Sequence, residues 1–427
     1  MNRSKIQSLP GRILDAPLLV WILLGFSISY LFFFLRPVFF SDQVMKFFRY
    51  IPALNTIGKD LKQMLDFSAS IAGHPPYIVN LYPPLASLLF TPLLLASFSW
   101  AYRIFSLITV FCYAAMTFVF PLQVNREKQV SSLIMFVFIT GLFSYGFQFE
   151  LERGQWNVVA VFLSFLAIWI YHYHHKQRYL AYILFTISVQ LKVFPLIFIV
   201  MLVDNWRDWG NNIKRSVVFA AVNFALFLVL GPKVFVDWVK ALTTVSGEPY
   251  VWVGNHSTRS FVEFASTTAA DHGWAWVNQY AGSAQPVLLA LIGICIFLVV
   301  LKAYLQNQKG INPHLLLACT LGALLIPSVS HDYKLSILAA PVALLFSSNK
   351  FQEEIKGYPL RTISILLLLI LSVAYSSTLV SYTNKPLIIQ NNFPALVIML
   401  MTVTFLYWMS KPAIEEKTTA STESPEI

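Results

Sequence analysis

Lys192 is the residue of this sequence whose position most strongly indicates chemistry. It lies inside an apolar block, within Gln190-Leu191-Lys192-Val193-Phe194-Pro195. A lysine at such a position is energetically expensive and usually faces a cavity, a partner or an anion. Its distance from both ends of the block makes extension of the side chain to the membrane interface the weaker alternative.

A second polar segment, at 328–334, interrupts two apolar blocks and contains His331 and Lys334. These side chains are suited to holding a phosphate by charge-assisted hydrogen bonds, although a plain interfacial turn would also explain them. Arg259, in the donor-rich stretch 254–260, is a further candidate cation.

Asp42 is the candidate general base. It follows the first apolar run by a few residues, in Phe39-Phe40-Ser41-Asp42. On position alone it is a solvated loop carboxylate. Near a membrane interface, however, its apolar and aromatic neighbours would partly desolvate it, which suits a carboxylate to general-base catalysis.

The remaining candidates lie in short connectors. The cluster 150–157 contains Gln155 and Asn157, and either a capped loop or a buried polar site accounts for it. Tyr82 stands before a proline pair, for which a rigid helix entry is the structural explanation. The histidine-rich run at 172–175 has no carboxylate nearby, and no Walker loop, dinucleotide fingerprint or nucleophile elbow occurs. The sequence therefore predicts neither a metal site nor a cofactor.

The elements that must position these residues are membrane helices. Hydrophobic residues make up 57% of the 427 residues and charged residues 12%, against about 25% charged in soluble domains. The apolar blocks approach the roughly 20 residues that cross a bilayer as a helix. The net charge of +10 fits anionic lipids and basic cytoplasmic loops better than nucleic acid, since no soluble basic domain exists to carry it. We expect an all-α polytopic membrane protein whose partners include membrane lipids and no nucleic acid.

About twelve apolar blocks, several of them short, predict 10–12 transmembrane helices in a single domain over residues 1–410. The blocks lie near 17–35, 81–98, 101–121, 130–148, 157–172, 179–202, 216–230, 285–304, 314–330, 335–347, 361–382 and 393–409. The tail, 411–427, is polar and is predicted to be disordered.

Two polar segments, 36–81 and 231–285, form the predicted external loops. In the first, Leu61, Met64 and Leu65 recur at helical spacing, which predicts an amphipathic helix on the membrane surface. The second is rich in aromatic residues, which favour the interface and also stack on sugars. Counting every block as a span, from a cytoplasmic N-terminus, places both loops on the non-cytoplasmic side.

The same count creates two conflicts. It places residues 154–157 on the cytoplasmic side, opposite Asp42, so that either a helix is re-entrant or those residues are structural. It also places Lys176 and Arg178 outside, against the bias of basic residues toward cytoplasmic loops.

The order of these segments resembles the bacterial polyprenyl-phosphate-mannose-dependent α-1,2-mannosyltransferases of the glycosyltransferase-C superfamily. The resemblance covers about residues 15 to 345 and rests on the aspartate after the first span, the amphipathic first loop, Tyr-Pro-Pro-Leu at 82–85, Gly-Gln-x-Asn at 154–157, Lys-x-x-Pro at 192–195, Gly-Asn-x-Ser at 254–257 and His-x-Tyr at 331–333. The sequence departs from the pattern after Asp42, where a tyrosine is expected, at the proline pair 75–76, and at His256, where glutamine is usual.

The resemblance implies a glycosyltransferase-C-like fold and inverting transfer of a hexose, mannose first among them, on the non-cytoplasmic face of the cell membrane. The donor is a polyprenyl-phosphate sugar and the acceptor a glycan or glycolipid. Asp42 matches the catalytic base, and a phosphate leaving group needs no general acid where cations receive its charge. The implied donor phosphate contacts are Lys192, His331, Lys334 and Arg259, and the implied substrate contacts are Tyr82, Gln155, Asn157, Trp252, Asn255, His256 and Ser257.

Two other functions are compatible with a polytopic chain. A transporter or lipid flippase predicts internal repeats with matching broken helices, and the sequence shows one clear break, at 192–195. A lipid-linked polymerase or ligase would share most of the architecture and differ mainly in the second loop.

Overall fold

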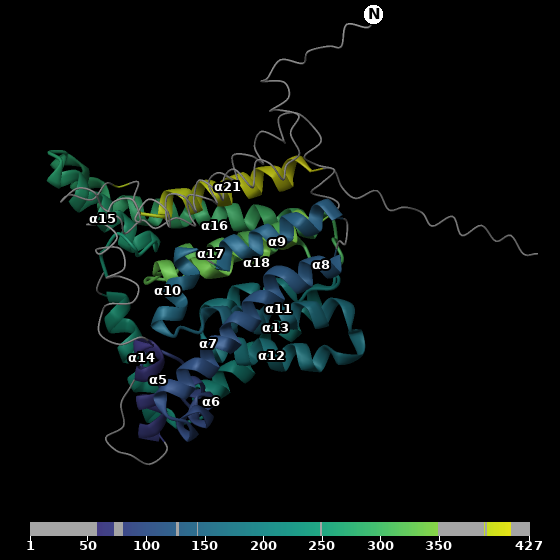
Figure 1. Cartoon of the computed structure of the whole chain (residues 1–427). Coiled ribbons are helices and arrows are strands. Elements are labelled where there is room, and N and C mark those ends of the chain that lie inside the picture. Colours follow the sequence, from purple (N-terminus) through teal and green to yellow (C-terminus); the bar gives the residue numbers. More distant parts are fainter. Residues whose placement is uncertain are drawn as a thin grey trace, which may run out of the picture.

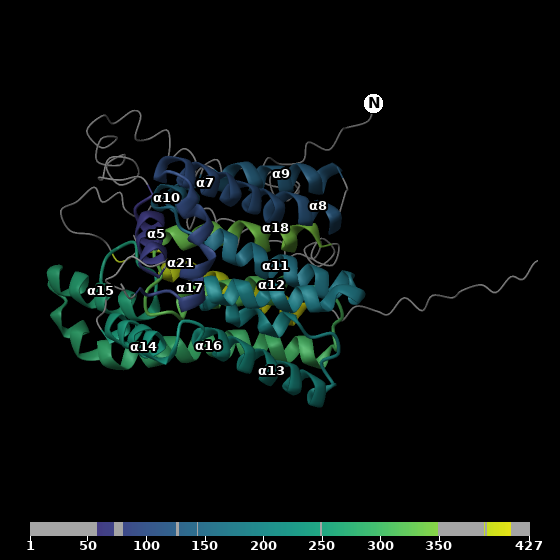
Figure 2. The ribbon, with the colours of Figure 1, turned by 90° about the horizontal axis from the view of Figure 1, so that it is seen from below.

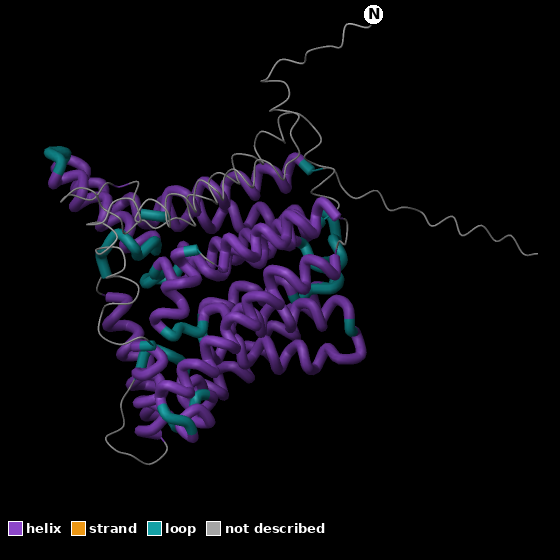
Figure 3. The backbone as a smooth tube through the Cα atoms, viewed as in Figure 1, coloured by secondary structure: helices purple, strands orange, loops and turns teal. Residues whose placement is uncertain are grey.

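The computed structural model describes residues 58–71, 80–124, 128–142, 144–247, 250–348, 388 and 391–410. Every regular element in these ranges is helical, which confirms the prediction of an all-α polytopic membrane protein. The longer helices lie side by side (Figure 1), and many of the turns gather at two ends of the bundle (Figure 3).

The first half of the chain forms a surface helix and the first bundle helices. In order these are α5 (Lys59–Ile71), α6 (Pro84–Leu89), η2 (Thr91–Leu95), α7 (Phe98–Ala114), the π-helix η3 (Ala115–Val119), α8 (Phe120–Val124), α9 (Lys128–Leu142), α10 (Tyr145–Arg153), α11 (Asn157–Tyr173), η4 (His175–Gln177), α12 (Arg178–Leu191) and η5 (Phe194–Met201). The π-helix precedes Pro121, which lacks the N–H that a regular α-helix would need there.

The second half completes the bundle. Its elements are α13 (Trp209–Phe227), α14 (Pro232–Gly247), α15 (Thr258–Asp271), η6 (Ala275–Tyr280), α16 (Ala281–Leu305), α17 (Pro313–Leu325), η7 (Asp332–Leu338), α18 (Ala339–Ser347) and α21 (Phe393–Met409).

We call the end of the bundle at which α5, α10 and α15 lie the α5 end (Figures 1 and 2). The opposite end contains the connections between α11 and α12 and between η5 and α13, which are joined by an ion pair of 2.7 Å between Arg178 and Asp204. The predicted external loop 231–285 contributes α14, α15 and η6.

Two helices form the centre of the bundle. Residues 314–325 of α17 and all residues of α18 are buried, and both are apolar around their whole circumference, as expected for helices surrounded by others. The three cysteines are buried and free, as expected of small core residues.

Two described helices are long and apolar enough to cross a membrane, Phe98–Val124 and Ala275–Leu305. Two bent pairs, α10 with α11 at 109° and α13 with α14 at 100°, raise this to four if each pair is one span. The predicted blocks at 17–35 and 361–382 lie outside the described residues.

The block at 81–98 does not form the spanning helix that the sequence suggested. It breaks into α6 and η2, and the stretch Pro84–Leu95 is too short to cross about 30 Å at 1.5 Å per residue. Pro92 is one physical cause, because it cannot continue the hydrogen-bonding ladder. This segment packs beside α5, where Ser68 Oγ donates to the carbonyl of Ser87 at 2.7 Å.

Removing that span from the predicted count places residues 154–157 on the same side as Asp42, and Lys176 and Arg178 on the other side. The block at 179–202 is not a single span either: it divides into α12 and η5, and a contact of 2.8 Å between Nε2 of His172 and the carbonyl of Met201 returns the chain to the end at which α12 begins. Residues 154–157 lie at the α5 end, and Lys176 and Arg178 lie at the opposite end (Figure 2). The predicted amphipathic helix is α5, which buries Leu61, Met64 and Leu65.

Candidate functional site

The first-loop helix α5 packs against the turn between α10 and α11. The backbone N–H of Gly58 donates to the carbonyl of Glu152 at 2.7 Å. Gly154 ends α10 in the left-handed conformation, with φ of 65°, and a Cβ added there would lie 2.8 Å from Cβ of Leu61. Both the backbone conformation and the close approach of α5 therefore require glycine at this position.

Asp60 is the charged contact of this docked helix. Its side chain is buried, and the guanidinium of Arg153 donates to both carboxylate oxygens, with Nε 3.1 Å from Oδ2. Nε2 of Gln155 also donates to Oδ2. A buried carboxylate needs such donors, because leaving it unpaired costs several kcal/mol.

Gln155 connects Asp60 to Lys192. Its Oε1 accepts a hydrogen bond from Nζ of Lys192 at 2.8 Å. Because a carboxylate only accepts and an ammonium only donates, this orientation of the amide alone satisfies both partners. Asp60, Gln155 and Lys192 therefore form a continuous chain, which we call the relay, from α5 to the end of α12.

Lys192 lies in the connection between α12 and η5, where its ammonium faces two aromatic rings. Its Nζ is 4.3 Å from the ring centre of Tyr82 and 4.6 Å from that of Trp156, within cation–π range. Burial lowers the pKa of Lys192 and the charge of Lys334 lowers it further, whereas Glu150 and Asp60 raise it. This is a desolvated cation that an incoming anion would stabilise.

Glu150 and Asn157 hold the sharp bend between α10 and α11. The fully buried carboxylate of Glu150 accepts from the backbone N–H of Val158 at 3.0 Å and from Nδ2 of Asn157 at 2.7 Å. A carboxylate at a helix N-terminus is electrostatically favourable. In this structure the amide nitrogen of Asn157, a predicted substrate contact, is used to fix the bend.

Lys334 reaches the region of Lys192 from η7. Its Nζ donates to the carbonyl of Val329 at 2.7 Å and lies 5.4 Å from the ring centre of Phe194, two residues beyond Lys192. Both lysines are less than one tenth exposed. Two of the cations predicted from the sequence therefore share one buried region.

His331 is oriented by Trp252. Nε1 of the indole donates to Nδ1 of His331 at 2.9 Å, so that Nδ1 is the unprotonated nitrogen. Burial lowers the pKa of His331, and the charges of Lys334, Arg153 and Lys192 act in the same direction. The neutral ring carries its proton on Nε2 and is able to donate one hydrogen bond.

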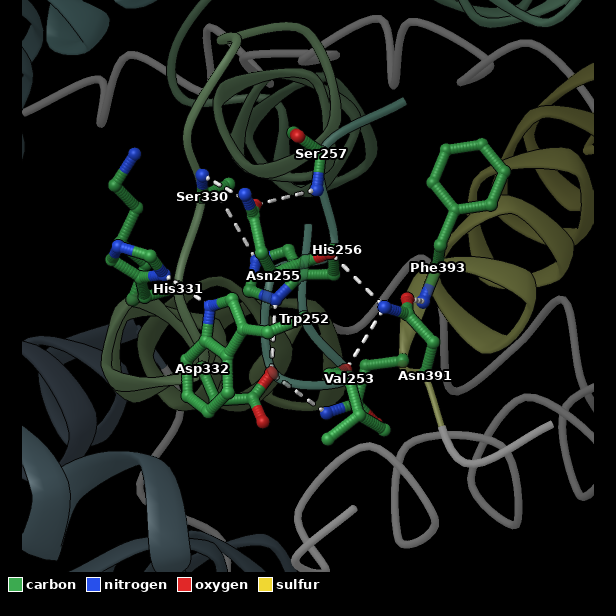
Figure 4. A network of polar contacts seen from close by, with 12 residues as sticks. Trp252, Val253, Asn255, His256, Ser257, Ser330, His331, Asp332, Asn391 and Phe393 are labelled. Carbon is green, nitrogen blue, oxygen red and sulfur yellow. Dashed lines mark hydrogen bonds and ion pairs between the residues drawn. The ribbon is translucent and has the colours of Figure 1, made fainter. Parts of the chain in front are cut away.

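Asn255, His256 and Ser257 belong to a buried network that joins the turn before α15 to the segment before η7 (Figure 4). All three are fully buried. Oδ1 of Asn255 accepts from the backbone N–H of Ser257 at 3.2 Å and of Ser330 at 2.9 Å. These contacts fix the backbone immediately before His331.

The same network continues through Asp332 and Asn391. Nδ1 of His256 lies 3.1 Å from Oδ1 of Asp332, and Nδ2 of Asn391 donates to the carbonyls of Val253 and Asn255. The polar groups that the sequence suggested for substrate binding are thus used here within the protein.

Arg259 stabilises the end of α14. Its guanidinium donates to the backbone carbonyls of Ser246 and Gly247, the last two residues of that helix, and a cation is favourable at a helix C-terminus. Contact of Arg259 with a donor phosphate stays a prediction.

The predicted base, Asp42, lies outside the described residues. Asp60 was not among the site residues predicted from the sequence. Asp60 precedes Met64 by four residues and Phe67 by seven, so that it shares their buried face. That spacing is the signal that could have found it.

A cavity of about 770 Å³ runs between α12 and α13. Its lining is mainly apolar, and the basic lining residues Lys214 and Arg215 lie at the end of the bundle opposite the α5 end. The lining residues are Leu85, Tyr182, Ile183, Thr186, Ile187, Asn211, Lys214, Arg215, Val218, Phe219, Val222 and Leu226. Leu85 and Ile187 lie at the α5 end, and Ile187 packs against the apolar cluster that contains Trp156 and Leu191.

Within the described ranges, no three His, Cys, Asp or Glu side chains converge so as to hold a metal ion. Comparison with curated proteins and with solved structures gives no match. The model of glycosyltransferase family 87, by contrast, matches residues 80–330. This match covers more than half of the chain and includes Gln155, Lys192 and Asn255. The chain therefore belongs to glycosyltransferase family 87, a family of membrane glycosyltransferases.

Proposed function

We propose that this glycosyltransferase transfers a hexose, mannose first among the candidates, from a polyprenyl-phosphate donor to a glycan or glycolipid acceptor. The observation that carries the proposal is the pair of buried lysines, Lys192 and Lys334, beside Tyr82, Trp156 and Phe194. A buried cluster of cations fits an anionic substrate group.

The two lysines suit the charge that develops in such a reaction. As the bond between the anomeric carbon and the phosphate oxygen breaks, the electron pair moves to that oxygen. Ammonium groups in a region with little water stabilise this charge more than the same groups would in water. The neutral His331 adds one hydrogen-bond donor, Nε2–H, to the same region.

Asp42 is the proposed base. The acceptor hydroxyl oxygen attacks the anomeric carbon, its proton passes to the Asp42 carboxylate, and the polyprenyl phosphate leaves with inversion. Two features support the assignment: Asp42 precedes α5 within the same loop, and α5 is connected to Lys192 through the relay.

The cavity between α12 and α13 is proposed to hold the first isoprene units of the donor. Its apolar walls match a hydrocarbon chain, and Leu85 is three residues beyond Tyr82, whose ring contacts Lys192. A phosphate at Lys192 would therefore place the lipid tail at the mouth of the cavity.

The α5 end is proposed to face away from the cytoplasm. Basic residues at the opposite end outnumber acidic ones in the described segments: Lys176, Arg178, Arg207, Lys214, Arg215 and Lys309 against Asp204 and Asp208. Such a bias marks the cytoplasmic side of membrane proteins. The site would then open to the side where polyprenyl-phosphate sugars are consumed in the resembling family.

The test is transfer of radiolabelled mannose from polyprenyl-phosphate mannose to membrane glycans. Membranes carrying the wild type are compared with Asp42→Ala, Asp42→Asn and the control Asp66→Asn at matched expression. Asp66 is an exposed carboxylate of α5. Transfer by the wild type and the control, with none by either Asp42 variant, supports the donor, the sugar and the base.

Equal transfer by all four proteins would exclude Asp42 as the base. If the wild type transfers glucose or another hexose from its polyprenyl phosphate but not mannose, the sugar assignment is wrong and the donor class stands. Absence of transfer from every polyprenyl-phosphate sugar contradicts the donor class.

A further inference from the structure

We propose that Asp60 is a positioning residue: through Gln155 it holds Lys192 in place, so that docking of α5 and binding of the donor phosphate depend on each other. This inference rests on the proposed function, in which Lys192 receives the phosphate. It assigns the first-loop helix a part in donor binding.

The relay has a direction that is set at its Asp60 end. Asp60 engages Nε2 of Gln155, which leaves Oε1 directed at Nζ of Lys192, 2.8 Å away. Without the carboxylate, Nε2 keeps only the hydroxyl of Tyr82, at 3.4 Å, as an acceptor, and the amide is held less firmly in that orientation. Lys192 would then lose an acceptor that fixes its ammonium over the rings of Tyr82 and Trp156.

The contact between Gln155 and Asp60 is not needed to hold α5. The helix is already attached by the Arg153 ion pair and by the backbone bond from Gly58 to Glu152. Gln155 points instead toward the lysine. Its contact with Asp60 therefore transmits the position of α5 to the site.

Thermodynamic linkage then works in both directions. If docked α5 favours the placed, charged Lys192, a phosphate on Lys192 must favour docked α5 by the same factor. Asp42 lies upstream in the loop that contains α5. Donor binding would thus favour the docked position of α5, the helix that follows Asp42 in the sequence.

The first measurement needs no donor. It reads the pKa of Lys192 from the ¹³C shift of labelled lysine in the detergent-solubilised full chain, with Lys192→Met for assignment. The charged groups facing Lys192 are Lys334 from η7, Glu150 from α10 and Asp60 from α5. Asp60→Asn should lower this pKa, whereas the exposed-site control Asp66→Asn should not. An unchanged pKa in Asp60→Asn would overturn the positioning role.

The second measurement is the affinity for polyprenyl phosphate, the donor without its sugar, followed by tryptophan fluorescence. Asp60→Asn should weaken binding about tenfold, the scale of one lost hydrogen bond to a charged group. Lys192→Met should weaken it at least as much, and the double variant no more than Lys192→Met alone. Additive losses would show that the two residues act separately, which overturns the coupling.

Gln155→Met is the second variant if Asp60→Asn folds poorly, because it interrupts the relay and keeps the ion pair between Asp60 and Arg153. Polyprenyl phosphate should slow amide exchange of α5 in the wild type, and it should not do so in Gln155→Met. Equal protection in both proteins contradicts the proposal. If the wild type binds no polyprenyl phosphate, the donor assignment and the coupling to phosphate both fail, while the pKa measurement still decides whether Asp60 positions Lys192.

Discussion

The indole N–H of Trp252 donates to Nδ1 of His331 at 2.9 Å, and this contact leaves Nε2 as the nitrogen of the neutral imidazole that carries the proton. Trp252→Phe keeps an aromatic ring and removes the N–H. We expect kcat to fall about tenfold with little change in donor KM, because a correctly oriented Nε2–H acts mainly on the leaving phosphate. Steady-state transfer kinetics measure the separate effects on kcat and on donor KM.

Two further variants make that comparison specific. His331→Ala should lower kcat more than Trp252→Phe does. The double variant should have a kcat no lower than that of His331→Ala alone. Trp274→Phe, at an exposed tryptophan of the same segment, 231–285, is the control and should leave kcat unchanged. A rise in KM alone for Trp252→Phe would instead indicate a role in binding.

Activity is expected to decrease as the pH rises. The decrease should occur at a lower pH than the titration of an ordinary lysine would produce. Burial and Lys334 lower the pKa of Lys192, and the ammonium is charged only below its pKa. Phosphate binding through Lys192 is therefore present at low pH and lost as pH rises through this lowered value. The pH dependence of kcat/KM reports it for the free enzyme.

Lys192→Arg tests this assignment, because a guanidinium keeps its charge throughout the range. The variant should have a lower rate, since its geometry differs, and should lack the alkaline decrease. Persistence of the same decrease would assign it to another group, with Lys334 as the next candidate.

Asn255 is expected to act through stability, in contrast to the substrate contact implied by the sequence. Asn255→Ala would leave the buried N–H groups of Ser257 and Ser330 without their acceptor. Each such loss costs about 1–3 kcal/mol, and thermal unfolding in detergent should show it. In the fraction that remains folded, donor KM should stay close to the wild-type value; a large rise in KM would favour direct substrate contact.

The fold class, and several residues that the structure brings together in the candidate site, were predictable because those features depend on local signals. Membrane helices follow from the length and composition of apolar blocks. Lys192 was recognisable because a cation inside such a block is unusual whatever the tertiary fold. The helix α5 followed from the spacing of Leu61, Met64 and Leu65.

The relationships between segments were not predictable in the same way. Asp60 and Arg153 are 93 positions apart, and nothing near either residue identifies the other. The block at 81–98 was apolar enough to read as a span, and its breakdown into α6 and η2 depends on Pro92 and on packing against α5. That one difference changes the number of spans counted before residues 154–157.

Gly154→Ala should separate the docking of α5 from the general stability of the bundle. The residue has φ of 65°, and a Cβ would lie 2.8 Å from Cβ of Leu61 and 3.2 Å from Cα of Gly58. Left-handed backbone costs a non-glycine residue about 1–2 kcal/mol, and here α5 must also move away. We expect faster amide exchange in α5 and a loss of transfer activity of tenfold or more.

Gly273→Ala is the matched control. Gly273 has φ of 88°, and a Cβ there would meet no atom within 4 Å, so that it carries the backbone strain without the collision. It should lower the melting temperature slightly and leave both transfer and exchange of α5 unchanged. Equal loss of activity in the two variants would attribute the effect of Gly154→Ala to backbone strain, and the contact between Gly154 and Leu61 would then have no special part in positioning the site.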